Sequence, residues 1–555
     1  MLFEVKSIQT YLMASGRLRD IIGASELVDR MTRKADVDQA APDSLLDAVL
    51  QSVDGAQSIQ FARRAGGALY AFSQDGGALR RFARLWTLSV QHWAPGIGYA
   101  LGWGCENSML ESFNAAREDL RQNASRTVPV FPIPAPVTAR TPRTGKAAIA
   151  RDRGREFVDA AGARSRRLAD SDDAGFFLRY SPPEAHLGAS DWPRDMDPAA
   201  AKDAEQGART GNAAFPFVDE DRSIALVHGD ANGMGQVLIA LNQSVRKSPD
   251  EFLKQYQRFS DAIDQSTCIA ARQATREVLL PARHTPQSAL AARPILLGGD
   301  DVVVLVRADL ALRYVQCFAE AFESQSATML EHLDVPGIPP RLTISFGIAF
   351  VNASQPFSSA VRLAESLMTE AKQRAREHAP DGIAPSTVCF HRISGTVLDS
   401  EYRDIVEHEL TLYESNGENR TSYIHTLGAY SLQADYSGLP TLDDLARLHS
   451  VLCSQNMARG PMRNLLNLLQ LAPPQARRAW KRWRQLMGDR DPNALAKFDT
   501  GMERLVPSYD ATSDVSGPYG RVDPRAPYRS PLGDVLTLMS TLREEPLLTT
   551  PSSAG

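Results

Sequence analysis

The chain has 555 residues and a net charge of −5, from 61 Lys and Arg against 66 Asp and Glu. This length predicts several domains, and the charge excludes a protein that is basic over its whole surface and coats nucleic acid, although a local basic groove remains compatible with it. The five cysteines are dispersed and form no CxxC pair, which disfavours a zinc ribbon and suits a reducing compartment. No stretch is apolar enough for a signal peptide or a membrane span. We therefore expect a soluble, cytoplasmic protein without membrane contact.

The first part of the chain alternates strand and helix patterns in a recognisable order. Residues 1–34 are expected to form a strand and then a helix. Two apolar runs at 59–64 and 68–72 read as strands joined across Gly66-Gly67. An amphipathic helix at 78–93 and a strand at 97–103 follow. The order strand-helix-strand-strand-helix-strand is that of a ferredoxin-like βαββαβ unit.

The same order returns later in the chain. The expected elements are a strand at 223–229, helices within 235–280, a hairpin at 294–298 and 302–306, a helix at 308–333 and a strand at 341–351. A helix follows the last strand in both copies, at 108–122 and at 358–378. We interpret this as an internal duplication. The copies differ at one turn, because Gly66-Gly67 precedes Ala68-Leu69 whereas Gly298-Gly299 precedes Asp300-Asp301.

The remaining regions are less regular. Residues 123–215 are expected to form an irregular linker region with one or two short strands. Its Arg-rich stretch at 151–168 is expected to be a solvated helix face, with a phosphate or RNA contact as the alternative. Residues 396–506 show helical spacing, and 507–555 have the composition of a mobile tail, apart from a short helix expected near Leu532 to Leu542.

Carboxylates occur at two strand ends of the second copy. Asp300 and Asp301 lie in the turn of the expected hairpin, and Asp230 follows the apolar strand at 223–229. Alone, the turn suits an ordinary tight hairpin, since glycine supplies positive φ and aspartate suits turns. Together with Asp230 it predicts a Mg²⁺ or Mn²⁺ site for nucleotidyl transfer, because these hard cations prefer oxygen ligands. We assign Asp230 and Asp300 as catalytic metal ligands, Asp301 as a ligand or the partner of one, and the Ala231 carbonyl as a further ligand.

The surrounding residues are expected to bind the nucleotide. Backbone amides at a helix start favour phosphate, and the candidates there are Asn232, Gly233, Met234 and Gly235. Gly298 and Gly299 leave space that any Cβ would occupy. Lys372 is expected to reach a phosphate, with a surface lysine as the alternative. Ser345 is a candidate for contact with base or ribose, with a structural packing role favoured, and His228 is expected to be a hydrogen-bonded strand residue rather than a base.

These motifs resemble a known family. Asp230-Ala231-Asn232-Gly233-Met234-Gly235 followed by Gly298-Gly299-Asp300-Asp301 resembles the second palm domain of the Cas-ten family, the large subunit of type III CRISPR effectors. The run from Leu18 to Ser25, ending in Gly23-Ala24-Ser25, resembles that family's first palm, which is catalytically empty. The resemblance implies an α+β fold with two ferredoxin-like palm domains. These are a first palm at 1–122, a degenerate zinc-ribbon-like linker at 123–215, a second palm with the GGDD site at 216–395 and a helical domain at 396–506.

The resemblance also implies an activity. It implies synthesis of cyclic oligoadenylate messengers from ATP in antiviral defence, with two ATP molecules bound between the palms and Ser25 bordering the acceptor nucleotide. The implied partners are ATP, guide or target RNA and other effector subunits, with a homo-oligomer also compatible. The chain departs from the family pattern in having no His-Asp dipeptide, so the family's HD nuclease domain is expected to be absent, and in having Asn232 where many members have Asp.

Two other functions compete with this one. A GGDEF-like diguanylate cyclase would use the same palm, but the turn lacks the Glu-Phe pair that this family carries. A non-catalytic scaffold subunit would bind crRNA or partner proteins and use ATP only structurally. Packed carboxylates such as Asp230, Asp300 and Asp301 would repel one another without a metal, which disfavours the scaffold.

Overall fold

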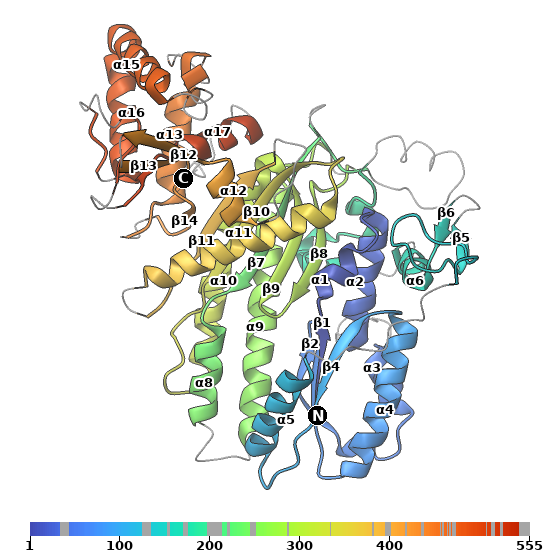
Figure 1. The fold of residues 1–555 in the computed structure, drawn as a ribbon. Coiled ribbons are helices and arrows are strands. Elements are labelled where there is room, and N and C mark those ends of the chain that lie inside the picture. Colours follow the sequence, from blue (N-terminus) through green and yellow to red (C-terminus); the bar gives the residue numbers. More distant parts are fainter. Residues whose placement is uncertain are drawn as a thin grey trace.

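The structure is a computed structural model of the chain, and it has a mixed α+β architecture (Figure 1). It describes residues 1–555 except 34–43, 125–134, 153–155, 170–175, 197–213, 219–221, 245–250, 286–287, 334, 380–381, 394–400, 417–418, 435–437, 455–456, 458–459, 463, 466–467, 469–472, 507, 512–516, 522–525 and 543–555. Within the described residues, no helix is both long and apolar enough to cross a lipid bilayer.

A four-stranded antiparallel sheet organises the first part of the chain. In sheet order its strands are β2 (Gln60–Ala65), β3 (Ala68–Phe72), β1 (Leu2–Lys6) and β4 (Gly98–Gly102). Its helices are α1 (Ile8–Met13), α2 (Leu18–Thr32), α3 (Leu45–Gln51), α4 (Gly76–Trp93) and α5 (Met109–Asn123). Asp75 fixes the start of α4 by accepting hydrogen bonds from the amides of Gly77 and Ala78. The strand-helix order predicted from the sequence is therefore observed.

Strand β3 explains why this sheet is covered on both faces. Its side chains alternate, so that Leu69 and Ala71 enter a core shared with α2 and α4, while Tyr70 and Phe72 face the other way. On that second face, Tyr70 packs against Phe113 of α5 and Phe72 against Phe252 of α9 (Phe252–Ala274), with ring centroids 5.9 and 6.3 Å apart. The first sheet is thus packed directly against a helix of the second unit.

A six-stranded sheet organises the second unit. In sheet order its strands are β14 (Ala429–Ser431), β11 (Thr387–Arg392), β10 (Ile344–Asn352), β7 (Ser223–Ala231), β9 (Asp301–Arg307) and β8 (Ala292–Gly298). The helices α8 (Met234–Ser244), α9, α10 (Ala311–Glu331) and α11 (Phe357–Glu377) cover it. Among the four strands of each predicted unit, the sheet order is the same: fourth, first, third, second along the chain.

In both units, a glycine in the fourth strand lets the following helix approach the sheet. A Cβ built at Gly102 of β4 would lie 2.0 Å from the carbonyl oxygen of Ala116 in α5. A Cβ at Gly347 of β10 would lie 2.0 Å from the carbonyl oxygen of Ala364 in α11. Each strand is therefore in backbone contact with its helix, which fixes how the helix lies across the sheet (α11 in yellow, Figure 1).

The segment between the units is tied to the first one. Its described elements include β5 (Ala150–Asp152), β6 (Glu156–Val158) and α6 (Ala160–Ala169). Helix α6 packs so closely on α2 that a Cβ at Gly23 would overlap the backbone of Ser165. Arg166 is 4% exposed and donates two hydrogen bonds to Asp20, at 2.6 and 3.0 Å. The prediction of a solvated basic face is therefore wrong for Arg166, which forms a buried ion pair.

The C-terminal region differs from its prediction. It contains α12 (Tyr402–His408), α13 (Leu442–Cys453), α15 (Pro473–Arg490), α16 (Pro492–Leu505) and α17 (Leu532–Thr541), together with a sheet of β12 (Thr411–Asn416), β13 (Asn419–Ile424) and β15 (Tyr528–Arg529). The expectation of a helical region at 396–506 is thus wrong for 411–431. The short helix expected near Leu532 to Leu542 is confirmed as α17. The expectation of a mobile tail around it is wrong for β15, which pairs with β13, and for α17 itself, whose Leu532, Val535 and Leu538 are buried.

Asp534 makes the packing of α17 sensitive to pH. Its carboxylate is buried and accepts hydrogen bonds from the amide of Leu427 and the hydroxyl of Tyr430, and burial raises its pKa from 3.8 to about 6. Because the folded pKa is the higher one, its stabilising contribution is complete below about pH 4 and is lost as the pH rises through about 6. Asp534→Asn is therefore expected to remove up to about 3 kcal/mol of pH dependence from the free energy of unfolding.

Urea denaturation of both proteins between pH 4 and pH 7.5 measures this. The difference in unfolding free energy between wild type and Asp534→Asn should change across that range, while the exposed Asp404→Asn variant on α12 should follow wild type. A difference that stays constant with pH would contradict the prediction.

Candidate functional site

The pairing of β7 with β9 brings the three predicted carboxylates together where β7 ends and β9 begins, in the second sheet. Asp230 and Asp301 are direct partners in this antiparallel pair, so their side chains lie on the same face. The amide of Ala231 donates to the carbonyl of Asp300 at 3.1 Å, which fixes the turn against the end of β7. Residues 70 positions apart in sequence thereby form one acidic cluster, as the sequence predicted.

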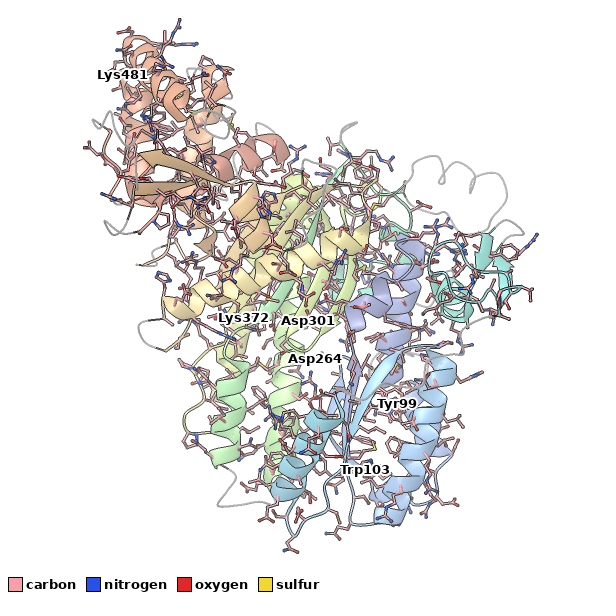
Figure 2. The ribbon with its side chains drawn as sticks, viewed as in Figure 1. Tyr99, Trp103, Asp264, Asp301, Lys372 and Lys481 are labelled. Atoms are coloured by element: carbon pink, nitrogen blue, oxygen red, sulfur yellow. The ribbon has the colours of Figure 1, made fainter. Side chains whose placement is uncertain are left out.

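Two cationic side chains neutralise this cluster. The ammonium of Lys372 on α11 donates to Asp230 Oδ2 at 2.5 Å and to the carbonyl of Ala231 at 2.8 Å. Arg63 of the first unit lies 3.8 Å from Asp300 Oδ1. Figure 2 shows Lys372 and Asp301 close to each other beneath α11, far from Lys481 in the C-terminal region. Lys372 is thus part of the cluster, and the alternative of an uninvolved surface lysine is excluded.

The pKa of Asp230 reflects these opposing neighbours. Burial raises it, the Lys372 ammonium lowers it, and the charges of Asp300 and Asp301 raise it again, with a net shift upward from the ordinary value. Burial is thus the main reason why the pKa of Asp230 is raised, and the charges of Asp300 and Asp301 add to it.

His228 belongs to the site, although the sequence predicted only a hydrogen-bonded strand residue. Its Nε2 lies 2.9 Å from Asp301 Oδ1 and 3.2 Å from Nε2 of Gln9 on α1. Burial lowers its pKa, but the charge of Asp301 and the hydrogen bond to it raise it more. The signal was available, because His228 stands two residues before Asp230 in a strand and so shares its face.

The loop after β7 is held by the sheet. The amide of Asn232 donates to the carbonyl of Thr343 at 2.8 Å, and its side chain donates to Thr343 Oγ1 at 3.0 Å and accepts from the Ser345 hydroxyl at 2.9 Å. Asn232 is 4% exposed and Ser345 is fully buried. The assignments of both to nucleotide contacts are therefore corrected, because these groups hold the loop in place. Gly233, with φ of +77°, then turns the chain into α8 at Met234 and Gly235.

Ser25 is not brought to the cluster either. It is 3% exposed on α2, and its hydroxyl donates to the carbonyl of Ile295 in β8. The assignment of Ser25 to the border of an acceptor nucleotide is corrected on this ground. Its role is to join α2 of the first unit to the edge strand of the second sheet.

The glycine turns of the two units meet each other. A Cβ at Gly66 would lie 3.4 Å from the backbone of Gly298, and one at Gly298 would lie 3.0 Å from Cα of Gly66. Gly299, with φ of +62°, lies beside Arg63, and its carbonyl accepts from Thr267 of α9 at 2.5 Å. Gly67 instead packs toward Val5 and Ile8 of its own unit. The first unit thus faces the carboxylates through Gly66 and Arg63.

A cavity of about 660 Å³ adjoins this contact and shares Arg63 with it. The cavity is lined by β1, β2, β3 and β4 of the first sheet, by α5, and by Leu238 of α8 and Tyr256 of α9. None of Asp230, Asp300 and Lys372 is among its lining residues. This space could not be predicted from the sequence, because it depends on how the two units pack.

The donor atoms at the cluster fit a hard divalent cation bound together with a nucleotide. Among the residues that the structure describes, no group of three or more His, Cys, Asp or Glu side chains is arranged to hold a metal ion by itself. Magnesium at phosphate-transfer sites is usually bound by one or two carboxylates with substrate phosphates and water. Asp230, Asp300 and the Ala231 carbonyl supply such oxygen atoms, and the Lys372 ammonium lies on two of them.

Comparison with known proteins identifies the domain that carries the cluster. Residues 223–379 match the family described as Cas10/Cmr2, second palm domain. The match begins at β7 and ends just beyond α11, so it contains all three carboxylates and Lys372. No curated protein matches the chain at a significant level.

Solved structures similar to the chain include Csm1 in T. onnurineus, at 14% identity and a TM-score of 0.47, with 98% of this chain and 69% of that one covered. A Csm1–Csm4 cassette in complex with AMPPNP is similar at 12% identity and a TM-score of 0.43, with 88% and 64% covered. A cassette in complex with pppApApA is similar at 13% identity and a TM-score of 0.43, with 91% and 64% covered. The chain therefore spans less than two thirds of the length of the matched chain in both cassettes.

Proposed function

We propose that this chain, whose residues 223–379 match the second palm domain of the Cas10/Cmr2 family, is a metal-dependent nucleotidyltransferase that makes cyclic oligoadenylate messengers from ATP. The observation that supports this most is the cluster of Asp230, Asp300 and Asp301 where β7 ends and β9 begins. Lys372 and Arg63 lie beside this cluster. A match to the second palm domain alone would also be compatible with a relative that has lost its catalytic residues. The presence of all three carboxylates favours an active enzyme.

The proposed reaction joins the 3′-oxygen of one nucleotide to the α-phosphorus of another. The bond from the 3′-oxygen to phosphorus forms and the bond from that phosphorus to the leaving pyrophosphate breaks. The proton of the attacking hydroxyl passes to solvent water at the partly exposed cluster. Asp230, Asp300 and the Ala231 carbonyl would hold Mg²⁺ or Mn²⁺, which when bound neutralises charge on the attacking and leaving oxygens. Asp301 would be kept in position by His228.

Lys372 and Arg63 have a second role in this proposal. Each contacts a carboxylate oxygen, so each lies where the phosphates of a bound nucleotide would come. Both are cations that can exchange a carboxylate partner for a phosphate partner. Gly298 and Gly66 let the two turns approach each other, because a Cβ at either would crowd the backbone of the other. The first unit would therefore serve the reaction by position and charge, without carboxylates of its own.

We also propose that the protein acts within a type III CRISPR effector, with other effector subunits and guide or target RNA as partners. This follows from the family of the second palm domain. A diguanylate-cyclase-like enzyme is the second candidate, because the same palm geometry would accept GTP. A non-catalytic scaffold is the third, and the carboxylate cluster disfavours it.

One assay separates these functions. The purified chain is incubated with each nucleoside triphosphate and Mg²⁺ or Mn²⁺, with and without RNA, and the products are resolved by chromatography and mass spectrometry. Cyclic products from ATP are the expected result. Consumption of GTP without ATP would favour the diguanylate cyclase, and no product from any nucleotide in the presence of RNA and metal would favour the scaffold.

A further inference from the structure

Helix α1 of the first unit is anchored in the second unit. Its Leu12 and Met13 are buried in the same core as Val303 of β9 and Leu367 of α11, and Figure 1 shows the helix between β1 and the second sheet. Ser7, which joins β1 to α1, has φ of +49°, a conformation that residues with a Cβ rarely adopt. The chain therefore makes a strained turn in order to place α1 here, and such strain often occurs at functional sites.

Gln9 is the residue of α1 that reaches the carboxylate cluster. Its amide group lies 3.2 Å from Nε2 of His228, and the same ring nitrogen lies 2.9 Å from Asp301 Oδ1. His228 and Asp301 are diagonal neighbours across the β7–β9 pair, so both side chains lie on one face of the sheet. Three side chains in contact thus connect the first unit to a carboxylate of the second.

The chemistry of these groups determines where the imidazole proton lies. A carboxylate can only accept a hydrogen bond, so Nε2 of His228 carries a proton and donates it to Asp301. The oxygen and the nitrogen of the Gln9 amide exchange places by a half-turn of the group, and only the oxygen can accept from this N–H. With its oxygen toward the ring, Gln9 is a second acceptor for the same proton.

Among the described residues, no other hydrogen bond orients this imidazole. Its Nδ1 is buried without a hydrogen-bond partner, and so is the far atom of the Gln9 amide. His228 itself is 3% exposed. The ring is therefore oriented by Gln9 and Asp301 alone. Without Gln9, its orientation would depend on Asp301, the same group that the ring has to hold in place.

From this arrangement we infer that Gln9 is a positioning residue for the metal site. It orients the imidazole of His228, and the imidazole in turn holds Asp301 beside the other carboxylates. Loss of a group that orients a metal ligand typically costs roughly 10- to 100-fold in metal affinity or activity. The inference rests on the proposed function only in placing a divalent cation at the carboxylates. The first unit would then help to form the metal site through α1.

Metal binding without turnover tests this role. The full chain is titrated with Mn²⁺ in the presence of α,β-methylene-ATP, which cannot release pyrophosphate, and free Mn²⁺ is measured by electron paramagnetic resonance. Gln9→Leu keeps the approximate volume of the side chain and removes the amide, and it should raise the Kd for Mn²⁺ about tenfold. Gln9→Ala should have the same effect, whereas a merely structural role predicts that leucine restores the packing. The matched control is Thr10→Ala at the exposed neighbouring position of α1, which should bind like wild type.

A double-mutant cycle tests whether Gln9 acts through the imidazole. His228→Phe fills the same space and removes the ring nitrogens, and it should weaken Mn²⁺ binding by itself. Adding Gln9→Leu to it should weaken binding no further, because the group on which Gln9 acts is already gone. Additive effects would overturn the inference. Mn²⁺ binding by Gln9→Leu that equals binding by Thr10→Ala would overturn it too, even when the enzyme makes product.

Steady-state kinetics distinguish metal positioning from a contact with the nucleotide. Gln9→Leu should raise the Mn²⁺ concentration that gives half the maximal rate and leave KM for ATP unchanged. A raised KM with an unchanged metal requirement would overturn the inference. If Gln9→Leu weakens Mn²⁺ binding but wild type makes no product from any nucleotide, the proposed function falls and the positioning role of Gln9 stands.

Discussion

Product formation is expected to fall by at least about a thousandfold when Asp300 and Asp301 are both replaced by alanine. The reason is that the two side chains supply the oxygen atoms next to Asp230, where the end of β7 lies against the glycine turn and Lys372 of α11. Alanine cannot bind a hard cation, and the several kcal/mol of charge stabilisation that the cation supplies would be lost with it. The measurement is the initial rate of oligonucleotide synthesis from ATP at saturating metal.

The fold should survive this change. Both carboxylates are partly exposed at a turn, and their ion-pair partners are Arg63 and His228. The matched control is Asp404→Ala/Glu407→Ala on the exposed side of α12, which removes the same charge and should leave the rate unchanged. Wild-type turnover by the Asp300→Ala/Asp301→Ala protein, with an unchanged circular-dichroism spectrum, would show that these residues do not carry the reaction.

A single methyl group at Gly347 is expected to destabilise the second unit by about 3 kcal/mol or more. The added Cβ would lie 2.0 Å from the carbonyl oxygen of Ala364 and 2.3 Å from the amide nitrogen of Met368. Both atoms belong to the backbone of α11, so relief requires the whole helix to move away from β10. Because α11 also carries Lys372, the same movement would pull that ammonium away from Asp230.

Thermal unfolding of Gly347→Ala measures the effect. Gly76→Ala is the matched control, because a Cβ there meets nothing within 4 Å and alanine favours the helix that begins at this residue. The expected result is a lowered first unfolding transition, or loss of soluble protein, for Gly347→Ala alone. Equal transitions for both variants would mean that α11 shifts at little cost.

The parts of the fold that sequence predicted well have strong local patterns. The strands and helices of both units follow from apolar periodicity, and the glycine pairs at 66–67 and 298–299 mark both hairpin turns. The mutual position of Asp230 and Asp301 follows from strand order, since the first and third strands of such a unit are neighbours. These features depend on short-range pattern and on one common topology.

The misplaced site residues are polar groups whose role depends on packing. Ser25, Asn232 and Ser345 have the chemistry of nucleotide contacts, but each forms a buried hydrogen bond within the protein. Sequence does not tell these cases apart, because a hydroxyl or amide serves either purpose. Arg63 was missed for a different reason. It reaches Asp300, 237 positions further along the chain (300 − 63), only because the glycine turns of the two units meet, and local sequence pattern does not encode such a long-range contact.

The hairpin of β12 and β13 was missed although its signal was present. Residues 411–424 read TLYESNGENRTSYI, with aromatic and β-branched residues on both sides of an Asn-Gly pair. The spacing of apolar residues from Tyr402 to Tyr413 predicts a helix that reaches into this segment, whereas α12 ends at His408. A turn signal of this kind should outweigh weak helical spacing, because Asn-Gly readily supplies positive φ.

The way in which α17 closes the C-terminal region has a consequence for how the chain folds as it is synthesised. Asp534 accepts from Leu427 and Tyr430, and β15 pairs with β13, so residues beyond 528 complete a structure begun about a hundred positions earlier. Strand β14, which contains Tyr430, is the edge of the sheet that carries the carboxylates. On the ribosome, both units can therefore assemble before residues 528–541 emerge, whereas β13 and Tyr430 of β14 gain these partners only afterwards. Chaperone dependence should concentrate in that interval, because the outer side of β13 is then an unpaired strand edge.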